Sequence, residues 1–123
     1  MRYHVSEDDS AIALGSGDVP VLATPRLIAW MEAATVDSAI AFLKPGETTV
    51  GIKIRIEHRR ATPVGGTVQV TATPTSDARD RRLTFAVAAI DDSGHVLAEG
   101  EIVREIVDRD RFLRAAADDG REN

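Results

Sequence analysis

Three side chains suited to acid–base chemistry stand in the middle of the chain: a glutamate, a histidine and a threonine. Glu32 lies between Met31 and Ala33 in an apolar segment, where a charge is costly unless it is paired or solvated. It therefore occupies either the one polar stripe of a helix or a partly desolvated cleft, as a functional carboxylate.

His58 ends a nine-residue stretch, Val50–His58, in which apolar and polar residues alternate. This alternation predicts a strand and places the histidine on its apolar face, with Val50 and three isoleucines, pointing inward. His58 is then either a core residue hydrogen-bonded to a carbonyl, or one half of an acid–base pair with a carboxylate on a facing helix.

Thr24 precedes Pro25 at the start of an apolar segment without glycine. We expect Thr24 to be the helix N-cap and Pro25 to take the first helical position. The hydroxyl and the free N–H groups of the first turn would also suit an oxyanion. At 100° per residue, Thr24 and Glu32 are about 80° apart around a helix, so they can border one groove without touching.

Arg59 and Arg60 follow His58 directly. They belong either to a solvated polar face or to a site for the phosphates of a ligand such as coenzyme A, which forked guanidinium donors suit. No segment has the glycine pattern of a phosphate-binding loop, and no acidic cluster has the spacing of a calcium loop. The sequence therefore predicts neither a metal nor a cofactor.

Composition narrows the class of protein. The 123 residues carry 15 Lys and Arg against 20 Asp and Glu, a formal net charge of -5, and no cysteine. This length predicts a single domain, residues 1–123, and the missing cysteines exclude disulfides and thiolate chemistry. The acidic balance argues against nucleic acid or a membrane as a partner. Without a signal-peptide pattern or a long apolar run, we expect a cytoplasmic protein.

Periodicity predicts the elements that must position these residues. Residues 1–23 form an N-terminal arm with a short strand at Arg2–Ser6, and residues 24–43 form a mostly buried helix ended by a Pro-Gly pair. Turn-rich connections then separate four strands and a final helix, and residues 108–123 make up that helix and a polar tail. The predicted ranges are Val50–His58, Thr67–Pro74, Leu83–Ile90, His95–Val103 and, for the helix, Asp108–Ala117.

One long helix followed by strands with short connections is an α+β order. Parallel strands would need crossovers of a dozen or more residues, so the sheet is predicted to be antiparallel. An antiparallel sheet wrapped around a long central helix is the hot-dog fold. Because so small a domain leaves much of its sheet uncovered, we also expect a homodimer.

Two segments of the sequence resemble the fluoroacetyl-CoA thioesterase family of hot-dog proteins. They are LATPRLIAWMEAATVDSAIAFLKPGETTVG and IKIRIEHRRATPVGGTV. They match the family's helix with a MEWA-like segment, its LxPGE exit and its strand ending in H-x-x-ATP-x-G. The resemblance covers roughly residues 20–107.

The resemblance implies a catalytic set of Thr24, Glu32 and His58. It also implies that the Gly51 backbone lies beside the acyl group and that Arg104 contacts the substrate. The implied reaction is hydrolysis of an acyl-CoA thioester in a site shared by two subunits, with no metal or organic cofactor. Aromatic residues cover a very small fluorinated acyl group in the family's founding enzyme, whereas GSGDVPVLA has none. A larger or different acyl group is therefore expected here.

Taken together, these features predict a thioesterase for a small or medium acyl-CoA. Glu32 would attack the thioester or activate water, His58 would exchange protons, and Thr24 would supply a hydroxyl, while Arg59 and Arg60 are candidates for binding CoA. Two other functions fit the same groove. One is a non-catalytic protein that binds acyl-CoA or another small molecule, and the other is an acyl-CoA hydratase or dehydratase.

Overall fold

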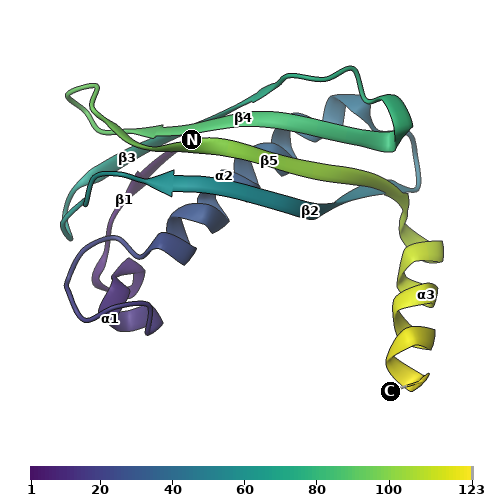
Figure 1. The fold of residues 1–123 in the computed structure, drawn as a ribbon, viewed down its shortest axis with the longest axis horizontal. Coiled ribbons are helices and arrows are strands. Elements are labelled where there is room, and N and C mark those ends of the chain that lie inside the picture. The colour runs from purple at the N-terminus through teal and green to yellow at the C-terminus, as the bar shows by residue number, and fades with distance from the viewer. Residues whose placement is uncertain (123) are drawn as a thin grey trace.

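A five-stranded antiparallel sheet curls around one long helix in the computed structural model, which describes residues 1–122 (Figure 1). The spatial order of the strands is β1-β3-β4-β5-β2. The strands are β1 (Arg2–His4), β2 (Glu47–His58), β3 (Thr67–Pro74), β4 (Arg82–Ile90) and β5 (Val96–Asp108). The helices are α1 (Ala11–Leu14), α2 (Thr24–Ala39) and α3 (Arg109–Glu122), with 3-10 turns at Glu7–Asp9, Ile40–Phe42 and Arg79–Arg81. This arrangement confirms the predicted hot-dog architecture.

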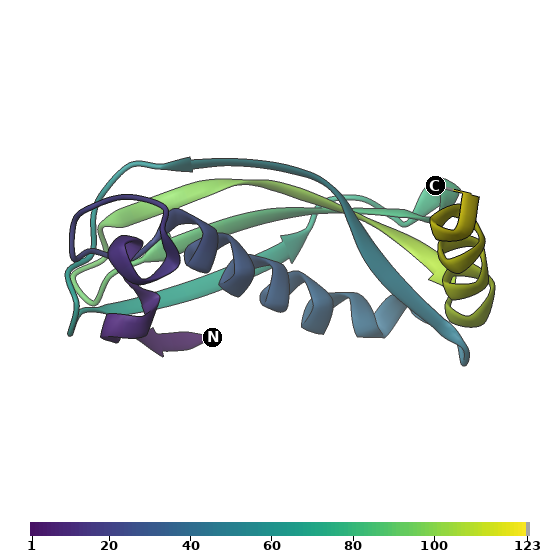
Figure 2. The same cartoon turned by 90° about the horizontal axis from the view of Figure 1, so that it is seen from below.

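The helix α2 packs on one face of the sheet, mainly against β3 and β4 (Figure 2). Leu27 and Met31 on α2 are completely buried, as is Phe85 on β4. Each such side chain stabilises the fold by about 1.5–3 kcal/mol relative to an exposed one. The strand β2, by contrast, lies at the sheet edge, and Ile52 and Ile54 remain 44% and 42% exposed.

The start of α2 differs from the prediction by one residue. Ala23 is the N-cap, and its extended backbone accepts the Leu27 N–H at 3.0 Å. Thr24 is the first helical residue and Pro25 the second, so the predicted N-cap role of Thr24 is wrong. The Ala23 N–H is fixed by the Asp9 carbonyl at 2.9 Å, which anchors the arm to the head of the helix. The Thr24 hydroxyl is consequently free for another partner.

Pairing between strands, rather than alternation, sets several element boundaries. The whole of β2 pairs with β5, from Glu47 opposite Asp108 to His58 opposite Ala98, and both strands are longer than predicted. The polar ends of these strands carry no period-2 signal.

The other element boundaries also differ from the predicted ones. The helix α2 ends at Ala39 and the 3-10 turn that follows it ends at Phe42. The strand β1 ends at His4, and α3 continues past Ala117 to Glu122. The arm also holds the unpredicted helix α1.

A β-bulge interrupts β2 next to Gly51. Gly51 and Lys53 pair with consecutive residues of β5, so Ile52 has no partner of its own. Because side chains alternate along a strand, the extra residue brings Gly51 to the helix-facing side together with His58. The prediction that Val50 shares the face of His58 is therefore wrong, since the bulge reverses the alternation between them.

The helix α3 projects from the end of β5 (Figure 1). Its first N–H, from Arg109, donates to the Gly46 carbonyl at 3.0 Å. The side chains described along it are exposed, Phe112 and Leu113 among them. Among residues 1–122, no helix combines the length and apolarity needed to cross a bilayer.

Candidate active site

The head of α2 and the end of β2 meet through a side-chain hydrogen bond. The Thr24 Oγ1 lies 2.8 Å from the His58 Nδ1. Both residues line a pocket of about 270 Å³, and the arm supplies part of its wall through Ser16, Gly17 and Val19. The hydroxyl, which does not cap the helix, thus orients the imidazole within this pocket.

His58 is held in its neutral form with one ring nitrogen unpaired. Burial lowers the pKa of His58 below the ordinary value of 6.5, and the backbone of Arg60 opposes this shift. If Thr24 donates to Nδ1, the Nε2 carries the proton, and if Thr24 accepts, the Nε2 is the acceptor. In either tautomer, Nε2 is buried and has no hydrogen-bond partner within the described part of the chain.

A second cluster forms around the carboxylate of Glu32. The Arg104 Nη1 lies 3.5 Å from the Glu32 Oε2, and the two side chains are 8% and 36% exposed. Arg104 also donates from Nε to the Thr49 hydroxyl at 2.8 Å and from Nη2 to the Thr49 carbonyl at 3.1 Å. Burial lowers the pKa of Arg104 and the charge of Glu32 opposes the shift, but a guanidinium stays charged at neutral pH.

Gly51 lies directly beside this carboxylate. A Cβ atom there would lie 2.9 Å from the Glu32 Oε2 and 3.4 Å from the Arg104 Nη1. The first distance is shorter than ordinary van der Waals contact, so a side chain would push the carboxylate away. The missing side chain therefore lets the Glu32 carboxylate and the Arg104 guanidinium lie close against the backbone of β2.

The predicted site residues fall into two separate groups within one chain. Thr24 joins His58, and Glu32 joins Gly51 and Arg104. Eight residues along α2 separate the groups by about 12 Å at 1.5 Å per residue. No hydrogen bond or ion pair links Glu32 to His58 among residues 1–122, so the acid–base pair considered for them is absent within a single chain.

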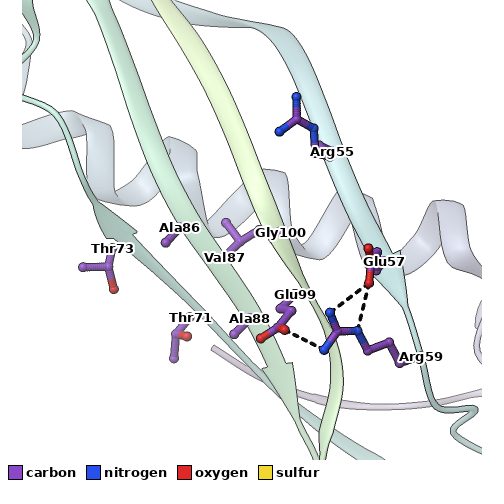
Figure 3. Close-up of a pocket in the computed structure, with 10 residues that line it drawn as sticks. All are labelled: Arg55, Glu57, Arg59, Thr71, Thr73, Ala86, Val87, Ala88, Glu99 and Gly100. Atoms are coloured by element: carbon purple, nitrogen blue, oxygen red, sulfur yellow. Dashed lines mark hydrogen bonds and ion pairs between the residues drawn. The ribbon is translucent and has the colours of Figure 1, made fainter.

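The two arginines after His58 differ in their surroundings. Figure 3 shows Arg59 held between two carboxylates over a groove of about 480 Å³ that crosses β3, β4, β5 and β2. Its guanidinium lies 2.8 Å from Glu57 and 2.7 Å from Glu99, and these contacts raise the pKa of Arg59. Any phosphate would have to compete with both carboxylates. Arg60 borders the pocket of Thr24 and His58 and stays a predicted CoA contact.

Sequence reasoning missed Thr49, which holds Arg104 through its hydroxyl and its carbonyl. The pair is separated by 55 positions in the chain, and the register of β2 against β5 that joins them is not visible in periodicity. Among residues 1–118, whose side chains the structure describes, no group of three or more His, Asp or Glu side chains is placed to hold a metal ion.

Comparison with known families places these residues in context. The family model for FlK, the fluoroacetyl-CoA-specific thioesterase, matches residues 5–110. A fluoroacetyl-CoA thioesterase from Streptantibioticus cattleyicolor is 36% identical over 92 residues. That stretch is 75% of this chain and 65% of the relative, so the chain covers slightly less than two thirds of that protein.

Solved structures of similar proteins have the same fold as this chain. A crystal structure of an FlK mutant in complex with fluoroacetate and CoA superposes with a TM-score of 0.87 at 28% identity, covering 97% of this chain and 96% of that one. A hot-dog-like protein from Thermanaerovibrio acidaminovorans gives a TM-score of 0.86 at 20% identity, covering 96% and 86%. The second similarity concerns the fold alone.

Proposed function

Because this chain belongs, as its motifs predicted, to the family of fluoroacetyl-CoA-specific thioesterases, we propose that it hydrolyses an acyl-CoA thioester. The observation that carries the proposal is the 2.8 Å contact between Thr24 and His58. It fixes an imidazole that lines a pocket and whose other nitrogen is buried without a partner among the described residues. An imidazole in this state can exchange a proton with a reacting group.

Hydrolysis breaks the carbon–sulfur bond of the thioester and joins the acyl carbon to an oxygen of water. The departing CoA thiolate takes up a proton. His58 Nε2 exchanges that proton, while Thr24 holds the ring in place through Nδ1. The burial that lowers the pKa of His58 keeps the ring neutral near pH 7, so it is ready to accept a proton at each turnover.

Glu32, which lies next to Gly51, acts on the thioester in one of two ways. It either attacks the thioester carbon, giving an anhydride that water then cleaves, or takes a proton from the attacking water. A single turnover in oxygen-18 water tests the first route, because label in the Glu32 side chain can arise only when water attacks the glutamyl carbon of an anhydride. Arg104 directs an N–H toward the same carboxylate, and we place the acyl group next to this pair.

The acyl group is small or medium in size. The arm residues beside Thr24 and His58 are Ser16, Gly17 and Val19, so this wall has no aromatic ring to fill the pocket. Room for a longer acyl chain than fluoroacetyl is thus consistent with the pocket wall. A screen of acyl-CoA chain lengths, followed by thiol release, identifies the preferred substrate.

A homodimer would bring the two groups of residues together. The edge strand β2 pairs with a neighbour on one side and leaves two isoleucines exposed, and unpaired edges favour pairing with another strand. Antiparallel pairing of two β2 strands can set Gly51 opposite His58 of the partner subunit. Directly opposite residues share a face, and both of these face the helix side. In that register the partner subunit's His58 lies next to Glu32.

Thiol-release kinetics test the catalytic assignment. We expect Glu32→Gln, His58→Ala and Thr24→Ala each to lower kcat/KM, by about 10²-fold or more for the two acid–base groups. His95→Ala is a matched control, because this exposed histidine pairs with Asp91 in a hairpin. Wild-type kcat/KM in all three site variants would contradict the assignment.

The same assays separate the alternative functions. Binding of CoA esters in calorimetry, with thiol release at background, would favour a binding protein. Hydration of an enoyl-CoA, identified in the products, would favour a hydratase or dehydratase. Free CoA and a carboxylic acid as products support hydrolysis.

Subunit mixing tests the shared site. The variants His58→Ala and Glu32→Gln are each inactive, but a heterodimer of the two has one site with both residues intact. Random exchange would then restore about a quarter of wild-type activity. No recovery from a mixture that forms heterodimers would show that each site lies within one subunit.

A further inference from the structure

Thr49 on β2 fixes the guanidinium of Arg104 at two points. The hydroxyl accepts from Nε at 2.8 Å and the carbonyl accepts from Nη2 at 3.1 Å. Two contacts to one residue define both the position and the plane of a guanidinium. The direction of the remaining nitrogen, Nη1, therefore follows from where Thr49 stands.

That remaining nitrogen points at the proposed catalytic carboxylate. The Nη1 of Arg104 lies 3.5 Å from the Glu32 Oε2, at the long limit of a hydrogen bond. A contact this long is sensitive to small rotations of the guanidinium. Arg104 is 8% exposed, so water has little access to replace a contact that is lost.

The bulge in β2 makes this arrangement possible. Thr49 and Gly51 lie on one side of it and His58 on the other, and the extra residue at Ile52 puts all three on the helix-facing side. Thr49 pairs with Ile106 and is half-buried. Its neighbour Thr48 pairs with Val107 and, by alternation, faces the opposite side.

We propose that Thr49 is a positioning residue for the reaction. It acts through Arg104, which its hydroxyl orients so that the Glu32 carboxylate stays in place beside Gly51. This inference rests on the proposed thioesterase function. It adds a residue that contacts neither the substrate nor the reacting oxygen.

The test compares Thr49→Val with Thr49→Ser and with Thr48→Val. Valine keeps the shape and the backbone carbonyl but removes the hydroxyl, so Arg104 loses its Nε partner. We expect kcat to fall about tenfold in Thr49→Val with KM changed less than about threefold. Thr49→Ser restores the hydroxyl and should restore kcat, and Thr48→Val should match the wild type.

A second measurement works without turnover. The Nε–H of Arg104 should give a slowly exchanging nitrogen-15 NMR signal in the wild type and in Thr49→Ser, and a shifted, faster-exchanging one in Thr49→Val. Circular dichroism confirms that each variant is folded at the assay temperature. The NMR measurement separates the positioning role of Thr49 from the proposed function. If the wild type has no thioesterase activity, the proposed function is overturned, but the NMR comparison still tests whether Thr49 orients Arg104.

Three results would overturn the proposal. They are an unchanged kcat and Nε–H signal in Thr49→Val, an equal loss of kcat in Thr48→Val, and a failure of Thr49→Ser to recover kcat. A fourth such result is a rise in KM with kcat intact, because it would show that Arg104 needs no orientation by this hydroxyl.

Discussion

Replacing Gly51 by alanine tests the geometry of the proposed site with a single methyl group. Gly51 is absent from the positions with a left-handed backbone, so alanine enters without backbone strain. The new Cβ would lie 2.9 Å from the Glu32 Oε2, whereas ordinary contact begins at 3.4 Å. The carboxylate must therefore retreat by about 0.5 Å, the difference between these distances. Arg104 cannot follow, because Thr49 holds it at two points.

The expected loss follows from this displacement. Misplacing a reacting group by about 1 Å can cost about 10²-fold in rate, so half that distance suggests about tenfold. Tenfold corresponds to about 1.4 kcal/mol in the activation barrier. The free energy of unfolding should change little or rise by up to about 1 kcal/mol, since alanine restricts the unfolded chain more than glycine does.

Thiol-release kinetics on the best acyl-CoA, with urea unfolding in parallel, measure both effects. If the methyl group acts by displacing Glu32, Gly51→Ala should have almost no further effect in a Glu32→Gln background. Wild-type kcat/KM in Gly51→Ala would refute the crowding argument. An equal loss in both backgrounds would refute it as well, because Gly51 would then act independently of the carboxylate.

Three further predictions concern pH and packing. Because burial lowers the pKa of His58, the acid limb of kcat/KM should have its midpoint below pH 6.5. The unfolded chain then binds this proton at a higher pH than the folded one, so stability should fall as pH drops below about 6.5, and His58→Gln should remove that part of the fall in thermal unfolding. The Arg81 side chain, 2.6 Å from Glu47, lowers the pKa of that carboxyl below 4.5. The pair therefore contributes stability above about pH 4.5 that disappears as pH falls through the lowered pKa, and the difference between wild type and Arg81→Gln in urea unfolding should shrink between pH 7 and pH 3. A Cβ at Gly100 would collide with the carbonyl oxygen of Arg55 on β2, so Gly100→Ala should lower the free energy of unfolding by about 1–3 kcal/mol; an unchanged urea midpoint would contradict this.

The elements of the fold were predictable because their signals are local. A glycine-free apolar segment gave α2, and period-2 alternation with turn residues gave the four strands that follow it. The family resemblance, which rested on motifs at fixed spacing, is confirmed. The head of the helix was placed one residue late because Thr-Pro is a strong capping pattern, whereas the arm holds Ala23 in the capping conformation through Asp9.

The residues of the proposed site could be named from the sequence, but the contacts that they make could not. Thr24, Glu32 and His58 stand out by type and surroundings, yet alternation alone put Val50 with His58 on one face. The bulge at Ile52 reverses this placement. The sequence gives no signal of the bulge, because apolar residues occur on both sides of it. The hold of Thr49 on Arg104 depends on strand register, which local patterns do not encode.

The bulge also limits how the gene can change by insertion and deletion. Removing the one unpaired residue, Ile52, would give β2 and β5 a regular ladder while turning Gly51 and Thr49 away from the face of His58. Such a shortened chain would keep every side chain assigned to chemistry, yet its two halves would face opposite sides of the sheet. We therefore expect a relative in which Gly51 and His58 are separated by a different number of residues to have a different site.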